Sequence, residues 1–207
     1  MGGRGSWSAS SGGTFDPHPA GGGGASTPET VLGPRIPETL AEALGPQGKT
    51  MSISAASKGT NPHYSQSYDA YSSNCQRCVL TYEARRRGYD VTALPTYSGD
   101  LLPSAGDYLK ALSNPKVVDV GKSTKKLEAQ MQQYGSGSRA IVRVARGGNG
   151  HVFIVENVRG RMTYVDPQTN SRYSKLSLSH VSMASLVRID NQQFTDYARK
   201  AFTTQKV

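Results

Sequence analysis

Two cysteines one helical turn apart, Cys75 and Cys78, are the residues of this chain best placed to do chemistry. Together with Val79 and Tyr82 they follow the i, i+3, i+4, i+7 spacing of a helix that buries one face. The spacing therefore predicts a helix that begins at Cys75. Amides of a first helical turn carry partial positive charge, which favours thiolate over thiol, so Cys75 stands where a nucleophilic cysteine is expected.

The predicted helix has recognisable ends. Ser73 or Asn74 could cap its first turn, because a short polar side chain can accept hydrogen bonds from the amides there. At the other end, the arginines at 85–87 suit the negative end of the helix dipole. Gly88 suits the left-handed conformation that often follows a helix. Cys78, one turn further in, is expected to be a core residue.

A cysteine nucleophile needs a base within hydrogen-bonding reach, and the base needs a third group to orient it. The chain has four histidines. His18 lies in a glycine-rich segment, His63 in a loop and His180 in a polar stretch. His151 directly follows a glycine-rich loop and opens a predicted strand, where a side chain is both held and accessible. The position favours His151 as the base.

His151 and Asp166 belong to the two strands of a predicted hairpin. If Arg159-Gly160 forms a two-residue turn, His151 faces Gln168 and Asp166 lies diagonally adjacent on the same side of the sheet. A turn one residue earlier puts His151 directly opposite Asp166. A three-residue loop without a bulge would instead send Asp166 to the other face. Two of these three registers bring the acid to the base.

The remaining pattern indicates an α+β domain in which helices come first and antiparallel strands follow. Further elements are expected from apolar spacing and turn residues: a strand over 89–94, a helix near 107–112, a helix over 124–134, strands over 140–145 and 185–190, and a final helix from Asn191 through Phe202.

Composition divides the 207 residues into a tail and a domain. Residues 1–60 hold 13 of the 23 glycines and 6 of the 11 prolines, so they are expected to form a disordered tail. Pro37 to Leu44 is the exception: its apolar spacing and the following Gly45-Pro46 predict a transient turn of helix, with a docking peptide as the alternative. The domain is expected over residues 61–207. The net charge of +9 lies wholly in this domain, because residues 1–60 are neutral overall. Such a basic domain could meet an acidic protein surface, nucleic acid or anionic lipid.

Several motifs occur in an order that is typical of one family. They are Asn74-Cys75-Gln76-Arg77-Cys78, a helix stop that ends Arg85-Arg86-Arg87-Gly88, Gly150-His151-Val152-Phe153, and Val165-Asp166-Pro167-Gln168. Over residues 60–190 the chain resembles the papain-fold toxin group of protein glutamine deamidases, also called Tox-PL. The upstream Asn61-Pro62 is also similar to the segment that opens this family's domain. The resemblance implies a papain-like cysteine hydrolase fold.

By this resemblance, Cys75 is the nucleophile, His151 the base and Asp166 the acid that orients it. The implied reaction is acyl transfer. The Cys75 thiolate attacks a glutamine carboxamide, His151 protonates the departing ammonia, and water hydrolyses the thioester. The chemistry requires no cofactor and no metal, and we expect none.

Three side-chain amides are expected near the reacting carbonyl. The backbone amide of Cys75, with a side-chain amide such as Asn74 or Gln66, could hold the oxyanion. Gln168 is expected either to line the site or to cap the turn after Asp166.

Members of this family occur in polymorphic toxins and in phage head or prophage proteins. The resemblance therefore implies a toxin or effector that acts on a protein bearing a reactive glutamine, with an immunity protein or a phage particle as further partners. No run of about 18 apolar residues occurs, so we expect no membrane span. The N-terminus lacks an apolar stretch, so we expect no secretory signal. A bacterial or phage cytoplasmic protein, delivered to a target cell or packaged in a virion, fits these expectations.

Two rival interpretations stay open. A papain-like peptidase would use the same three residues on a backbone amide. A basic phage structural or nucleic-acid-binding protein would make the triad incidental, but the sequence carries no basic strand motif with stacking aromatic residues, so nucleic acid is not an expected partner. A zinc site would need two more ligands than the cysteines, and we expect none.

Overall fold

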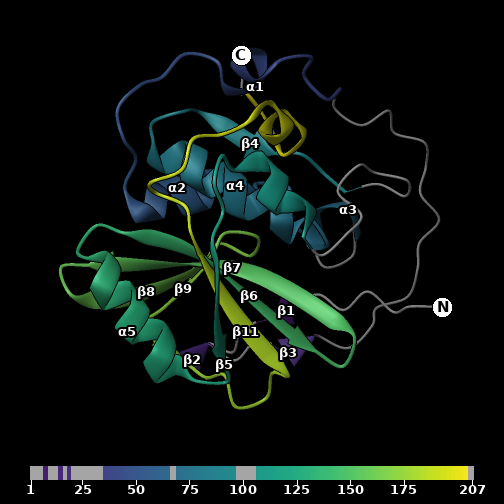
Figure 1. Ribbon diagram of the computed structural model, residues 1–207. Coiled ribbons are helices and arrows are strands. Elements are labelled where there is room, and N and C mark those ends of the chain that lie inside the picture. The colour runs from purple at the N-terminus through teal and green to yellow at the C-terminus, as the bar shows by residue number, and fades with distance from the viewer. Residues whose placement is uncertain are drawn as a thin grey trace.

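A six-stranded antiparallel sheet with helices on both faces forms the core of the computed structural model (Figure 1). The structure describes residues 7–8, 14–15, 18–19, 35–65, 69–96 and 106–204. The strand order is β5-β11-β6-β7-β8-β9, and each neighbouring pair runs antiparallel. In chain order the strands are β5 (Val117–Gly121), β6 (Arg139–Arg146), β7 (Asn149–Val158), β8 (Arg161–Asp166), β9 (Ser171–Tyr173) and β11 (Met183–Arg188).

The helices are mostly short. They are α1 (Leu40–Leu44), α2 (Ile53–Thr60), α3 (Asp69–Ser72), α4 (Cys75–Arg86) and α5 (Thr124–Tyr134), with two 3-10 helices, η1 (Asp107–Ala111) and η2 (Asp196–Lys200). None of the helices in the described part of the chain is both long and apolar enough to cross a membrane.

Three small sheets complete the described elements. β4 (Val91–Ala93) pairs with β12 (Phe202–Thr204), β1 (Trp7–Ser8) with β3 (His18–Pro19), and β2 (Thr14–Phe15) with β10 (Lys175–Leu176).

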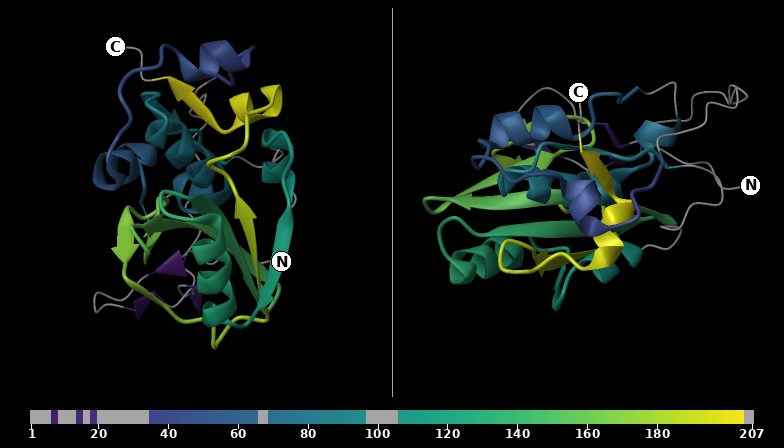
Figure 2. Two further views of the ribbon diagram at one scale, coloured as in Figure 1. Left: turned by 60° about the vertical axis from the view of Figure 1, so that its left-hand side comes forward. Right: turned by 90° about the horizontal axis from the view of Figure 1, so that it is seen from above.

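Alternation along the central strands gives the sheet two apolar faces, because successive side chains of a strand point to opposite sides. On one face, Ile141, Val152 and Ile154 pack with α4 in a core that also contains Tyr108. On the other face, neighbouring residues of the same strands pack against Leu127 and Met131 of α5. Figure 2 shows α1, α2, α4 and η2 gathered on one side of the sheet, with α5 apart from them.

Helix α4 is held on the sheet by buried ion pairs near its C-terminal end. Arg86 pairs with Glu156 of β7 at 2.8 Å, and Tyr82 donates to the same carboxylate at 2.6 Å. Glu83, whose side chain is wholly buried, accepts from Arg139 at 2.6 Å and from Arg87 at 2.8 Å. The predicted stop is confirmed: Gly88 has φ +105°, and a Cβ there would lie 2.4 Å from the carbonyl oxygen of Gly48.

The structure corrects the expected boundary of the tail. Residues 35–60, predicted to be disordered, include α1 and α2, and Ala43 and Ala56 are fully buried in the core of the helical face. Helix α1 lies within the segment Pro37 to Leu44, for which only a transient turn of helix was expected. Helix α2 was not predicted, because a short helix rich in alanine and serine carries little apolar signal of its own. Most of residues 1–34 lies outside the described part of the chain.

Two further expectations change. The final helix through Phe202 is instead the short η2 followed by strand β12, and Phe202 pairs with Ala93 of β4. The first turn of α4 has Asn74 at its N-cap position, but the Asn74 side chain makes no capping hydrogen bond and instead bonds to Asn61 and Leu94. Strand β5 was not predicted, because its burial pattern is irregular.

The packing of α2 on the domain predicts that glutamate substitutions at two adjacent alanines of this helix differ sharply in their effect on the free energy of unfolding. Ala56→Glu should lower the free energy of unfolding by at least about 3 kcal/mol, because it places an unpaired charge in the core. Ala55→Glu, on the exposed side of the same helix, should change it by less than about 0.5 kcal/mol. Urea denaturation of both variants measures this. Equal and negligible effects would mean that α2 does not pack on the domain.

Candidate active site

The first turn of α4 and the start of β7 bring Cys75 to His151. Cys75 is partly buried at the first position of the helix, whereas the His151 side chain is fully enclosed. Cys75 lies within electrostatic reach of the imidazole and contributes to the pKa of His151. The two side chains predicted to be nucleophile and base therefore approach each other across the interface between helix and sheet.

Asp166, at the end of β8, holds the other side of the imidazole. Its Oδ2 lies 2.9 Å from His151 Nε2, and both side chains are buried. The second oxygen, Oδ1, accepts from the backbone N–H of Gln168 at 3.1 Å. With Nε2 engaged by Asp166, the nitrogen that can face the thiol is Nδ1. The carboxylate is thus fixed at both oxygens and in turn fixes the ring.

The hairpin adopts the first of the predicted registers. Ile154 lies opposite Val165 and Val158 opposite Arg161, which leaves Arg159-Gly160 as a two-residue turn. Both turn residues have positive φ, 52° and 87°, as a tight hairpin turn of this hand requires. This register makes Asp166 a diagonal neighbour of His151, as the alternation argument predicted.

The environment of His151 favours its protonated form. Burial alone would lower the pKa of the imidazole, but the charge and hydrogen bond of Asp166, together with the hydrogen bond and charge of Cys75, outweigh it and raise the pKa to about 10. At neutral pH the ring is therefore an imidazolium between a carboxylate and a sulfur.

A buried network of three side-chain amides lies behind the site. Asn74 donates from Nδ2 to Asn61 Oδ1 and to the carbonyl oxygen of Leu94, both at 3.2 Å. Its Oδ1 accepts from Asn61 at 3.3 Å and from Gln168 at 3.4 Å. The network ties the residue before the nucleophile to the segment after Asp166.

This network revises the expected roles of the amides. Both Asn74 Nδ2 hydrogens have protein acceptors, so Asn74 is not available to donate to an oxyanion. Gln168 is buried and serves the network and the Asp166 carboxylate. Gln66 lies outside the described residues.

Cys78 has the properties of a core thiol. It is fully buried and donates to Asn74 Oδ1 at 3.2 Å. Burial, followed by the charges of Cys75 and Asp166, raises the pKa of Cys78 well above its usual value. Its thiol therefore stays protonated and anchors Asn74.

Tyr108 of η1 is a neighbour of the site that sequence reasoning missed. It is 1% exposed and belongs to the core against which Cys75 packs. Burial raises the pKa of Tyr108 to about 12, with Arg143 opposing the shift and Cys75 adding to it. The phenol thus lies within electrostatic reach of both residues, and nothing in the spacing of η1 signals this.

A family model described as "Papain fold toxin 1, glutamine deamidase" matches residues 73–171. This match supports the resemblance to the papain-fold glutamine deamidase family that the sequence motifs indicated. No curated protein and no solved structure gives a match. The match, together with the arrangement of helices and antiparallel sheet, confirms the papain-like α+β fold expected from the sequence. It spans α4 and the whole β7-β8 hairpin, and so contains Cys75, His151 and Asp166.

His63 and His180 are both exposed, unlike the enclosed His151. His63 is exposed and its ring lies 5.3 Å from that of Tyr71, and His180 is exposed in the loop before β11. No group of three or more His, Cys, Asp or Glu residues among the described residues could hold a metal ion.

The burial and pKa of the two thiols predict selective alkylation. Brief treatment with iodoacetamide at pH 7.5 should label Cys75 and leave Cys78 unmodified, because the Cys78 thiol is enclosed and protonated. Peptide mass spectrometry locates the adduct. Unfolding the protein in guanidinium provides the control, since both thiols should then react. Labelling of Cys78 ahead of Cys75 in the native protein would reverse their assignments.

The raised pKa of His151 predicts how stability depends on pH. Its folded-state value of about 10 lies above the usual 6.5, so the protonated ring stabilises the fold fully below about pH 6.5. That stabilisation should be lost as pH rises toward 10. The free energy of unfolding should therefore fall by a few kcal/mol, on the order expected for such a shift, between these limits. In His151→Gln this part of the slope should vanish; an identical slope in both proteins would contradict the assignment.

Proposed function

We propose that this domain is a cysteine-dependent amidohydrolase that converts glutamine side chains of a protein substrate to glutamate. The observation that carries the proposal is the buried 2.9 Å hydrogen bond from His151 to Asp166, with Cys75 within electrostatic reach of the same imidazole. A nucleophile, a base and an orienting acid brought together in this way are the parts of a catalytic triad. The match to a glutamine deamidase family supports the choice of reaction.

In the first half-reaction the Cys75 thiolate attacks the side-chain carbonyl carbon of glutamine. A carbon–sulfur bond forms and the carbonyl oxygen takes the negative charge. His151 then donates its Nδ1 proton to the amide nitrogen, so that ammonia leaves and a thioester remains. Asp166 stays ionised and holds the Nε2–H, which keeps Nδ1 directed at the sulfur.

In the second half-reaction water replaces ammonia. The neutral imidazole removes a proton from the water, the hydroxide adds to the thioester, and the thiolate leaves with glutamate as product. The raised pKa of His151 favours return of the imidazolium at the end of the cycle. Ammonia is released once in each turnover.

The oxyanion is assigned to the start of α4. The first amides of a helix have no acceptor within it, and the amide of Cys75 is the one nearest to the attacking sulfur. The buried Asn74 network supports this role indirectly, because it fixes the peptide that carries the Cys75 N–H.

The triad predicts a specific pattern of variants. Cys75→Ala, His151→Ala and Asp166→Asn should each reduce ammonia release by about 10³-fold or more, and the Cys75→Ala/His151→Ala double variant should be scarcely worse than either single one. Asp166→Asn should be impaired because an amide cannot stabilise the imidazolium. His180→Ala, at an exposed histidine of the loop before β11, is the matched control and should keep full activity.

The assay should follow two products on the same candidate substrate proteins. A gain of about one dalton at a glutamine, with ammonia, identifies deamidation, while a cleaved backbone identifies a peptidase. Full activity in His151→Ala would refute the triad. Backbone cleavage without deamidation would establish the peptidase interpretation.

A further inference from the structure

Arg143 lies on β6 beside the catalytic end of the sheet. Its chain neighbour Val144 is the residue opposite His151, and Arg143 itself is opposite Val152. Because strand residues alternate, Arg143 points to the same face as Ile141, which is the face that packs against α4. The guanidinium therefore belongs to the interface between helix and sheet in which Cys75 lies.

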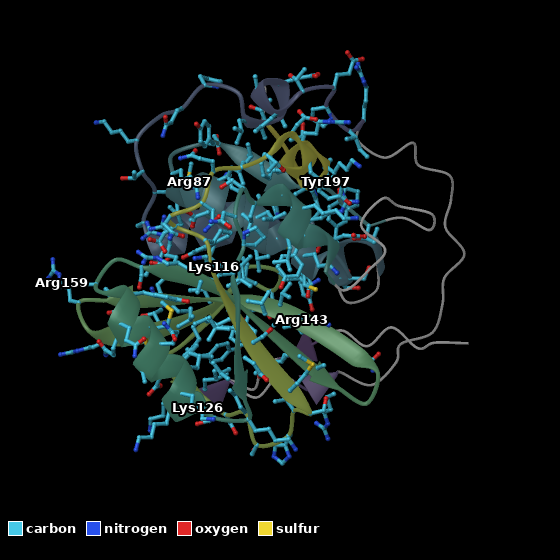
Figure 3. The ribbon with its side chains drawn as sticks, in the orientation of Figure 1. Arg87, Lys116, Lys126, Arg143, Arg159 and Tyr197 are labelled. Carbon is cyan, nitrogen blue, oxygen red and sulfur yellow. The ribbon has the colours of Figure 1, made fainter. Side chains whose placement is uncertain are left out.

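Two observations connect Arg143 to the nucleophile. Its charge acts on the Tyr108 phenol, and the same phenol is within electrostatic reach of Cys75. Tyr108, Val152 and Cys75 also pack in one core cluster. In Figure 3 Arg143 lies at the boundary between the helices and the sheet, on the opposite side of the view from Arg159 at the tip of the hairpin.

Arg143 differs from two other arginines of this interface in that no residue of the described part of the chain serves as its counter-ion. Arg86 and Arg139 pair with glutamates at 2.8 Å and 2.6 Å. Within the described residues, no hydrogen bond or ion pair is formed by Arg143. A partly desolvated cation without a partner carries a free-energy cost that an anionic ligand would remove.

We propose that Arg143 is a specificity-determining residue that binds a carboxylate of the protein substrate close to the target glutamine. The proposal rests on the proposed deamidase function and adds the chemical class of the substrate: a glutamine with an aspartate or glutamate beside it. Guanidinium matches a carboxylate with two parallel hydrogen bonds, which gives direction as well as charge. The net charge of +9 favours the approach of such an acidic segment.

Arg143 could instead act on the sulfur itself by stabilising the thiolate. The two roles differ in what they select. A substrate-binding cation favours an anionic reagent over a neutral one, whereas a thiolate-stabilising cation changes the reactivity toward both equally.

A pair of alkylating probes separates these roles without a known substrate. Iodoacetate and iodoacetamide attack the same sulfur but differ by one negative charge. The ratio of their rates at Cys75 should fall by about fivefold to tenfold in Arg143→Gln, the size of one charge-assisted contact near a surface. Arg143→Lys should retain much of the ratio, because lysine keeps the positive charge although it cannot form the two parallel hydrogen bonds of a guanidinium.

Arg161→Gln is the matched control. It removes the same charge from an exposed strand residue at the turn end of the hairpin, about 20 Å along β7 from His151. It should leave the ratio as in the wild type. An unchanged ratio in Arg143→Gln, or an equal fall in Arg161→Gln, would overturn the proposal.

A peptide series tests the same proposal on the wild-type protein and needs no variant. Glutamine peptides flanked by glutamate, alanine or lysine should be deamidated with kcat/KM falling in that order, mainly through KM. Equal rates across the series would refute the role of Arg143 and leave the deamidase intact. Absence of ammonia from every peptide and every protein substrate, with Cys75 unreactive, would instead refute the proposed function.

Discussion

The attachment of α4 to β7 at both ends is the constraint on which the rest of the structure depends. At one end Cys75 meets His151, and at the other Arg86 meets Glu156. The two helical positions are about 16 Å apart along the axis at the usual rise per residue. The two strand positions are also about 16 Å apart. Helix and strand therefore run side by side in matching lengths, and the ion pair at one end sets the register of the reacting atoms at the other.

The buried carboxylates make this register unique. Glu83 and Glu156 are nearly inaccessible, and a buried carboxylate that loses its partners costs several kcal/mol. Sliding α4 by one turn, about 5.4 Å, would separate both glutamates from Arg86 and Arg139 at once. Apolar packing alone would tolerate small shifts of the helix, since it has little directionality. The ion pairs of Glu83 and Glu156 thus supply the precision that the proposed pairing of Cys75 with His151 requires, although they lie at the other end of the helix.

Local signals predicted the parts of the site that depend on nearest neighbours in the chain. The helix starting at Cys75, its end at Gly88 and the pairing of His151 with Asp166 follow from spacing, glycine conformation and strand alternation. What could not be predicted depends on distant partners. The Asn74 side chain does not cap α4, because it forms buried hydrogen bonds with Asn61 and Gln168 from other segments instead. Phe202 is part of a strand because β12 pairs with β4, which is distant in the sequence. Likewise, Tyr108 comes near Arg143 only when η1 packs into the core on this face of the sheet.

The two ends of the described domain are fastened to each other. Arg199 of η2 donates to the carbonyl oxygen of Pro37 at 2.8 Å, and the N–H of Leu40 donates to Asp196 at 3.2 Å. At Gly45 the backbone of α1 comes so close to Thr204 that a Cβ would lie 2.8 Å from its hydroxyl oxygen. Strand β12 also contacts α1. Because α1 and β12, the first and last elements of residues 35–204, share one corner, a short linker could join them and new ends could be opened elsewhere, so this part of the chain is suited to circular permutation and to insertion as a unit within another protein.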